Sequence, residues 1–143
     1  QMFKESVVEQ IPVQVRVGES AAEIHAAHVI IDNINNFLHQ EGQAGRELPG
    51  KTFLTIKRDL AFASKQCVGA VSRLSGMMGV TAQTGRNPVQ RHFRDCRTIS
   101  MHGGLQWDSA MGPNGKIIFG LPTGDSKVDN SESSSKLDRA LIN

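Results

Sequence analysis

The chain has 143 residues, 38% of them hydrophobic, and a formal net charge of +2 at pH 7. This length allows one domain with a real core, and the charge is too small to indicate a nucleic acid or an acidic membrane surface as partner. No apolar run approaches the ~20 residues of a membrane-spanning helix, and no secretory leader is recognisable at the start. These features predict a cytoplasmic protein that binds neither membrane nor nucleic acid.

Residues 1–19 have mixed character and predict the end of a preceding helix and a linker. Within them, Val13-Gln-Val-Arg-Val17 alternates apolar and polar residues, as a short extended segment does. Ser20-Ala-Ala-Glu23 then has the Ser-x-x-Glu form of a capping box, which predicts a helix start. The helix should continue to about His39 with one apolar stripe, made by Ile24, Ala27, Ile31, Ile34 and Leu38.

A second helix is predicted from about Lys57 to Met78, where residues repeat at helical spacing among many small side chains. Small residues permit close approach of helices, so this segment should be central in a bundle. It runs into Ser75-Gly-Met-Met-Gly79, whose two glycines should loosen the chain and expose backbone N–H groups. The two cysteines, Cys67 and Cys96, have no CxxC partner and are expected to be small buried residues rather than a disulfide.

A third helix should start at Asn87-Pro88, with Asn as N-cap and Pro in the first turn, and run to about Met101 or on toward Trp107. Residues 20–108 thus predict an all-α antiparallel helical bundle, although the fourth helix that three apolar stripes require is not obvious. Residues 109–143 predict an irregular tail. It should contain a strand-like piece at 116–119, a Ser- and charge-rich disordered stretch at 125–136 and a weak helical turn at 137–142.

The third helix carries the residues with chemical potential. At about 100° per residue, Arg91, Asp95, Thr98 and His102 fall on one face, which joins a cation, a carboxylate, a hydroxyl and an imidazole. The face ends just before Gly103-Gly104, where a ligand could come close. A plainer interpretation is also open at this stage: a surface ion pair worth ~0.3–0.5 kcal/mol and a histidine that ends a helix.

The pattern Pro-x-Gln-Arg-x-x-Arg-Asp over residues 88–95, with His102 seven residues after the aspartate, resembles a known family. It is similar to the third helix of flavin-dependent aromatic hydroxylases of the acyl-CoA dehydrogenase superfamily. These are oxygenase components that act on 4-hydroxyphenylacetate, on a steroid-ring phenol or on dibenzothiophene. The stretch Ser75-Gly-Met-Met-Gly79 sits where the superfamily has its glycine-rich flavin contact. The resemblance covers residues 20–108.

The resemblance implies a carboxy-terminal bundle domain that lacks its first helix. It implies an oxygenase component that inserts one atom of O₂ into an aromatic or heteroaromatic substrate through a flavin C4a-hydroperoxide. Reduced FMN or FAD would come from a separate flavin reductase. His102 is then the expected catalytic residue, and the expected flavin-binding residues are Ser75, Gly76, Gly79, Arg91 and Asp95. No metal is expected, because His25 and His28 lack a third ligand.

Relatives of this kind have an amino-terminal helical domain and a middle β-domain and form homotetramers, so the chain alone is expected to be an inactive piece that also mediates oligomerisation. Two alternatives stay open. An acyl-CoA dehydrogenase would need a glutamate about eight residues beyond Asp95, where this chain has Gly103. A non-catalytic helical assembly domain is the other alternative, supported only by the regular apolar stripes.

Overall fold

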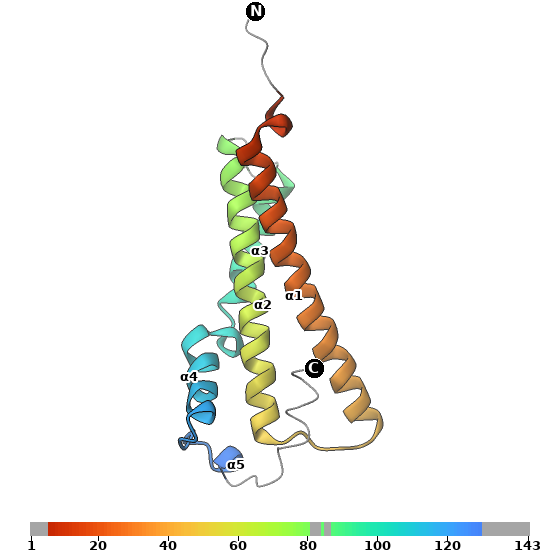
Figure 1. Ribbon diagram of the computed structural model, residues 1–143, viewed down its shortest axis with the longest axis vertical. Helices are drawn as coiled ribbons and strands as arrows, with labels where there is room; N and C mark the ends of the chain where they lie inside the picture. Colours follow the sequence, from red (N-terminus) through yellow and green to blue (C-terminus); the bar gives the residue numbers. More distant parts are fainter. Residues whose placement is uncertain (1–5, 81–83, 85–86, 130–143) are drawn as a thin grey trace, which may run out of the picture.

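The structure, a computed structural model, describes residues 6–80, 84 and 87–129 (Figure 1). Its elements in chain order are the short 3₁₀ helix η1 (Val7–Glu9) and the long helices α1 (Ile11–Gln43) and α2 (Gly50–Met77). They continue with α3 (Pro88–Ser100), the 3₁₀ turn η3 (Gly103–Leu105), α4 (Trp107–Ile118) and the single turn α5 (Ser126–Asp129). No strand occurs in these ranges, which confirms the predicted all-α bundle.

Helix α2 is the centre of the bundle, as its small residues predicted. It runs antiparallel to α1 and contacts α1, α3 and α4. Helix α3 lies behind α2 in the view of Figure 1, and α4 follows it on the side of α2 away from α1. Together they make the neighbour that a single longer helix would otherwise provide, and η3 marks the break between them. This break therefore lies part of the way along α2.

The core joins α1 and α2. Ile34, Phe37 and Ile56 form a buried cluster, and four alanines of the two helices are also buried: Ala27, Ala61, Ala63 and Ala70. An alanine adds little bulk, so two helix axes can lie close where alanines meet. The predicted stripe of α1 is only partly buried, because Ile24 and Leu38 are 46% and 38% exposed.

Helix α1 begins at Ile11, with Pro12 in its first turn, so the predicted extended segment at Val13–Val17 is wrong. Valine costs a helix only a few tenths of a kcal/mol, which is too little to interrupt a long helix, and Val15 and Val17 stay exposed within it. Helix α1 also passes without a break through residue 20, where the linker was expected to give way to the bundle, and ends at Gln43 rather than near His39. Its end is held by Arg46, whose guanidinium donates to both oxygens of Glu41 at 2.7 and 2.6 Å.

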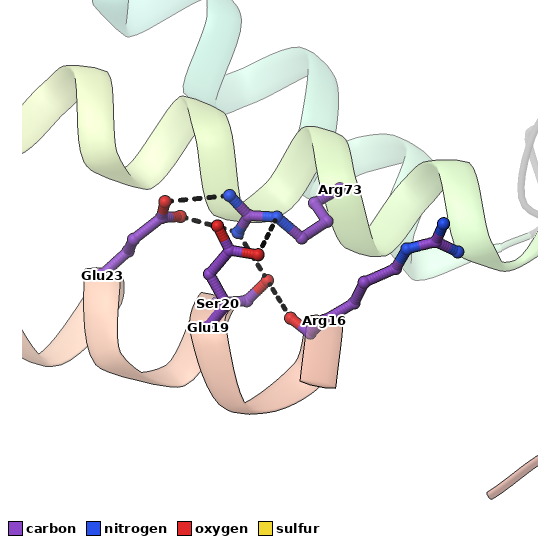
Figure 2. Close-up of polar contacts among 5 residues, drawn as sticks. All are labelled: Arg16, Glu19, Ser20, Glu23 and Arg73. Carbon is purple, nitrogen blue, oxygen red and sulfur yellow. Dashed lines mark hydrogen bonds and ion pairs between the residues drawn. The ribbon is translucent and has the colours of Figure 1, made fainter. Parts of the chain in front are cut away.

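Ser20 and Glu23 do not form a capping box, because they lie in the interior of α1. Ser20 is 1% exposed, and its hydroxyl donates to the Arg16 carbonyl at 2.8 Å and accepts from Arg73 at 3.0 Å. Figure 2 shows the Arg73 guanidinium of α2 facing Glu23 and Glu19 of α1. It donates to both Glu23 oxygens at 2.7 and 2.9 Å, and its Nε lies 3.2 Å from Glu19. This hydrogen bonding holds the pKa of Glu23 below its usual value.

The predicted irregular tail contains the fourth helix of the bundle. Helix α4 occupies residues 107–118, so the strand-like interpretation of residues 116–119 is wrong, even though Pro113 lies inside the helix. Asn114 is 5% exposed and ties α4 to α2, since its amide donates to the Leu54 carbonyl at 2.8 Å. The local sequence pattern could not reveal this contact, because it depends on a partner sixty residues away.

Part of the stretch predicted to be disordered is ordered. Helix α5 covers Ser126–Asp129, and Val128 is buried against the start of α2 at Gly50, where a side-chain Cβ would lie only 2.8 Å from the valine. The Asp129 carboxylate accepts hydrogen bonds from Thr123 and Gly124. Residues 130–136 and the turn predicted at 137–142 lie outside the described residues. Among the helices that are described, none has the length and apolarity to cross a membrane.

Candidate functional site

The start of α3 is as predicted. The Asn87 side chain accepts a hydrogen bond from the Val89 N–H at 3.0 Å, and Pro88 fills the first turn, where a missing N–H costs nothing. The helix ends at Ser100. None of its residues is fully buried, and its half-buried side chains are mainly apolar or small: Val89, Phe93, Cys96 and Ser100. The polar face of α3 is therefore not buried against the rest of the bundle.

Arg91 and Asp95 lie on that polar face. The Arg91 Nε is 3.6 Å from an Asp95 oxygen, and their side chains are 78% and 53% exposed. Such a pair in water contributes little to stability. Thr98, predicted to share the face, uses its hydroxyl within the helix and donates to the Arg94 carbonyl at 2.9 Å. What α3 offers to a ligand is thus an exposed guanidinium with a carboxylate beside it.

His102 does not lie on α3 but just beyond it. Met101 caps the helix, and His102 has extended backbone angles and serves as the N-cap of η3. Its Nδ1 accepts the Gly104 N–H at 3.1 Å, which leaves Nε2 to carry the proton of the neutral ring. The single helical face expected to run from Arg91 to His102 therefore does not exist. Instead, the imidazole is exposed at the break between α3 and α4.

The proposed glycine-rich contact lies at the other end of α3. Ser75 and Gly76 belong to the last turn of α2, and Gly79 follows the Met78 cap with a φ of 63°. Ser75 is 3% exposed, whereas Gly76 and Gly79 are exposed. Because α3 starts near the end of α2 and runs back along it, Gly76 and Gly79 are at the Arg91 end. His102 is more than two helical turns away.

A cavity beside the His102 turn was not foreseen. It has a volume of about 490 Å³ and is lined by α2, the end of α3, η3 and the start of α4. At its rim, the Lys65 ammonium lies 3.8 Å from the centre of the Trp107 ring. The sequence did not indicate that Lys65 and Trp107 would meet, since no local pattern links residues on two separate helices.

The two cysteines are free thiols and only half-buried. Burial, with the nearby charge of Cys96, raises the pKa of the Cys67 thiol. A half-buried thiol whose pKa is raised is a poor nucleophile. Within the described residues, no three His, Cys, Asp or Glu side chains are arranged to hold a metal ion.

The fold of this bundle and its sequence define a class of protein. Residues 1–107 match the family model of the acyl-CoA dehydrogenase C-terminal domain, and the chain belongs to this family. The structure superposes on the crystal structure of the HsaA monooxygenase from Mycobacterium tuberculosis with a TM-score of 0.69 and 29% sequence identity, over 79% of this chain. The 3-HSA hydroxylase from Rhodococcus sp. RHA1 gives the same TM-score with 28% identity over 80% of this chain.

Curated relatives point to one branch of the family. The oxygenase subunit HsaA of the flavin-dependent monooxygenase from Mycobacterium tuberculosis is 31% identical over 116 residues, which are 80% of this chain. The oxygenase component of p-hydroxyphenylacetate 3-hydroxylase from Acinetobacter baumannii is 27% identical over 111 residues, or 77% of this chain. The chain spans only 29% and 26% of these two relatives. It is thus similar to one domain of larger oxygenase subunits.

Proposed function

We propose that this chain is the carboxy-terminal domain of the oxygenase component of a reduced-flavin-dependent monooxygenase that inserts one atom of O₂ into an aromatic or heteroaromatic substrate. The observation that carries the proposal is the exposed His102 at the α3–α4 break of a bundle that is similar to oxygenase subunits. The next position is Gly103, which has no carboxylate to remove an acyl α-proton. This argues against the acyl-CoA dehydrogenase alternative.

The exposed groups fit a flavin in part. Arg91 can pair with a flavin phosphate, because its guanidinium is 78% exposed and lies 3.6 Å from the exposed Asp95 carboxylate, a loose pair that a phosphate could replace. Asp95 would then orient Arg91 rather than take part in the chemistry. Gly76 and Gly79 have open space beside their Cα atoms at the same end of α3, so a ligand could come close to the chain there. Ser75 is buried, so its contribution would be limited to the backbone of that turn.

His102 is the residue proposed to handle protons. The Gly104 N–H fixes its tautomer by occupying Nδ1, and the protonated Nε2 can donate a hydrogen bond to a bound oxygen species or pass a proton on. Imidazole suits this exchange because it can gain and lose a proton near neutral pH. When bound, reduced FMN or FAD supplies the two electrons that turn O₂ into one inserted oxygen atom and one water.

The proposal implies further parts and partners. A separate flavin reductase would deliver the reduced flavin in the cytoplasm, and the other domains of such an oxygenase component would complete the flavin and substrate sites. Several large apolar side chains along α1 are exposed, among them Ile11, Val15 and Val29. Such a face is suited to contact another subunit, in keeping with a homotetramer. If the chain were only an assembly domain, the same face would serve but His102 and Arg91 would have no role.

The test is His102→Ala in the complete oxygenase component. We expect the variant to fold normally, since His102 is exposed and only caps a 3₁₀ turn. Loss of a general acid or base typically lowers a rate by ~10²–10⁴-fold, so reduced flavin should be consumed to give hydrogen peroxide instead of product. Stopped-flow kinetics and the product yield per reduced flavin measure both effects.

His92→Ala is the matched control, because His92 is also exposed but lies on α3 itself. It should keep the parent yield. A His102→Ala enzyme as productive as the parent would refute the assigned role. Loss of yield in the His92 variant alone would mean that the wrong histidine was chosen. The isolated chain, which lacks most of the site, should bind reduced flavin weakly and have no oxygenase activity.

A further inference from the structure

The two cysteines of the chain come from two helices that pack against each other. Cys67 lies in α2 and Cys96 in α3, and both are free thiols that are half-buried. The neighbours of Cys96 along α3, Asp95 and Arg97, are exposed, whereas Cys96 itself is partly covered. Since α2 is the main neighbour of α3, the Cys96 thiol lies on the side of α3 that packs against α2.

The register of the two helices brings the cysteines to the same level. Helix α3 runs antiparallel to α2, so a step toward the start of α3 matches a step toward the end of α2. Ser100 of α3 and Ser64 of α2 line the same cavity beside η3, which places them at similar heights along the two helices. One helical turn further, about four residues in each helix, lie Cys96 in α3 and Val68, the neighbour of Cys67, in α2.

An electrostatic effect supports this arrangement. Burial and, after it, the charge of Cys96 raise the pKa of the Cys67 thiol. One ionisable group affects another in this way mainly at short range. The side of α3, the register and this effect agree, so the two thiols are neighbours across the α2–α3 contact, with no bond between them.

We propose that Cys67 and Cys96 are a redox-active pair, which hydrogen peroxide oxidises to a disulfide that ties α3 to α2. The Cys96 thiolate attacks one oxygen of the peroxide, and the O–O bond breaks. Hydroxide leaves and takes up the thiol proton as water, and Cys96 becomes a sulfenic acid. The Cys67 thiolate then attacks the Cys96 sulfur and displaces the hydroxyl group as a second water, which closes the S–S bond.

The balance of this reaction is complete. The two thiols lose two electrons and two protons, and one hydrogen peroxide is reduced to two waters. Cys67 is the slower nucleophile because the pKa of its thiol is raised, which assigns the first attack to Cys96. In a reducing compartment such a bond is reversible, as it is in proteins that sense oxidants.

The disulfide links the least firmly packed long element to the central helix. Helix α3 has no fully buried residue, and it leads into the turn that carries His102. A covalent link to α2 restricts the opening of this helix. The inference stands without the proposed function, since peroxide from any source can oxidise the pair. If the proposed function holds, the peroxide released when oxygenation fails is an oxidant formed close to the pair.

The experiment treats the reduced 143-residue chain with hydrogen peroxide at low protein concentration. We expect the number of free thiols to fall from two to none, with a mass lower by two hydrogen atoms and no cross-linked dimer on a non-reducing gel. Dithiothreitol should restore both thiols. Hydrogen exchange of the α3 amides should slow at least about tenfold in the oxidised chain, because the link opposes local opening.

Variants separate the two thiols and test the geometry. Cys67→Ser should leave Cys96 as a sulfenic acid that dimedone traps, and Cys96→Ser should react with peroxide more slowly than Cys67→Ser. The matched control combines Cys96→Ser with Thr98→Cys, which moves the second thiol to an exposed position of α3. This control keeps two thiols and should not close the bond, while circular dichroism confirms an intact bundle.

The proposal is overturned if both thiols survive peroxide, if they end as separate sulfenic or sulfinic acids, or if bonds form only between chains. It is equally overturned if the Thr98 control closes the bond as readily as the parent, because the reaction then does not depend on how α2 and α3 are arranged. Oxygenase activity does not enter this test, so failure of the proposed function would leave the cysteine pair standing.

Discussion

The two sides of α2 are built differently. Toward α1, α2 contributes to a closed core, and Arg73 is bound by three side chains of α1. Toward α3, it meets a helix without a single fully buried residue. Both contacts use α2, but only the contact with α1 includes a cluster of fully buried apolar side chains, which is what stabilises a helix pair.

This difference separates folding from recognition. Residues of the α1–α2 contact pack against and hydrogen-bond to one another, so substitutions there should lower the stability of the fold. Arg91, Asp95 and His102 belong to the other side and are exposed, so folding does not require them. Side chains that the fold does not require are available to bind a ligand or another domain. The comparison therefore predicts opposite effects for substitutions on the two sides.

The largest effect on stability is expected for Phe37→Ala. Phe37 is 9% exposed within the α1–α2 core, and truncation of a buried phenylalanine typically costs ~3–5 kcal/mol. Urea unfolding followed by circular dichroism measures the loss. Phe93→Ala on the half-buried side of α3 is the control, with an expected cost of about 1–2 kcal/mol. Equal costs would break the comparison, because α3 would then be as much a part of the core as α1.

The sequence predicted the bundle because helical spacing, small residues and the Asn87–Pro88 start are local signals. It failed where the outcome depended on distant residues. Val13, Val15 and Val17 alternate like a strand, and Ser20 with Glu23 looks like a cap, yet Arg73 on another helix recruits both Ser20 and Glu23 in mid-helix. Helix α4 was hidden for the same reason, since its glycines and Pro113 argue locally against a helix that α2 nevertheless stabilises.

The candidate site was predictable as a set of residues but not as an arrangement. The spacing of Arg91 and Asp95 correctly predicted that both lie on one face of α3, one turn apart. The helix then ends two residues before His102, where Gly103-Gly104 follows, and this end moves the imidazole off the face. A pair of glycines is a local sign of a helix end, so the position of His102 beyond α3 could have been predicted from the sequence. The flavin contacts of these residues stay predictions.

An intermediate effect is expected from the Arg73 cluster, and it should depend on pH. Hydrogen bonds from Arg73 lower the pKa of Glu23 in the folded chain, so the stabilisation is complete above the ordinary glutamate pKa and is lost as the pH falls through the lowered value. Glu23→Gln should be less stable than the parent at pH 7, and the difference should shrink below about pH 4.5, the ordinary value. Thermal unfolding over this pH range measures it.

Other acidic groups titrate in the same range, Glu41 and Asp129 among them, because hydrogen bonds lower the pKa of each. They are present in both proteins, so their contribution cancels when the parent is compared with Glu23→Gln. Glu19 stays as a weaker partner of Arg73 in the variant. A stability difference that is constant from pH 7 to acid would show that Glu23 contributes through packing rather than through its charge.

The smallest effect on stability is expected on the polar face of α3, and it sharpens the comparison most. Asp95→Asn removes the carboxylate that faces Arg91, but the pair is exposed and its atoms are 3.6 Å apart, so the free energy of unfolding should change by less than ~0.5 kcal/mol. Arg91→Gln should have an equally small effect in urea unfolding of this chain.

In the complete oxygenase component the two variants should differ. Arg91→Gln loses the proposed phosphate partner and weakens binding of reduced flavin, whereas Asp95→Asn keeps the guanidinium and loses only its orientation. Anaerobic titration with reduced flavin measures this order. If Arg91→Gln destabilises the bundle by more than 1 kcal/mol, on the order of a buried hydrogen bond, the guanidinium serves the fold, and α3 is not the free recognition surface that its exposure indicates.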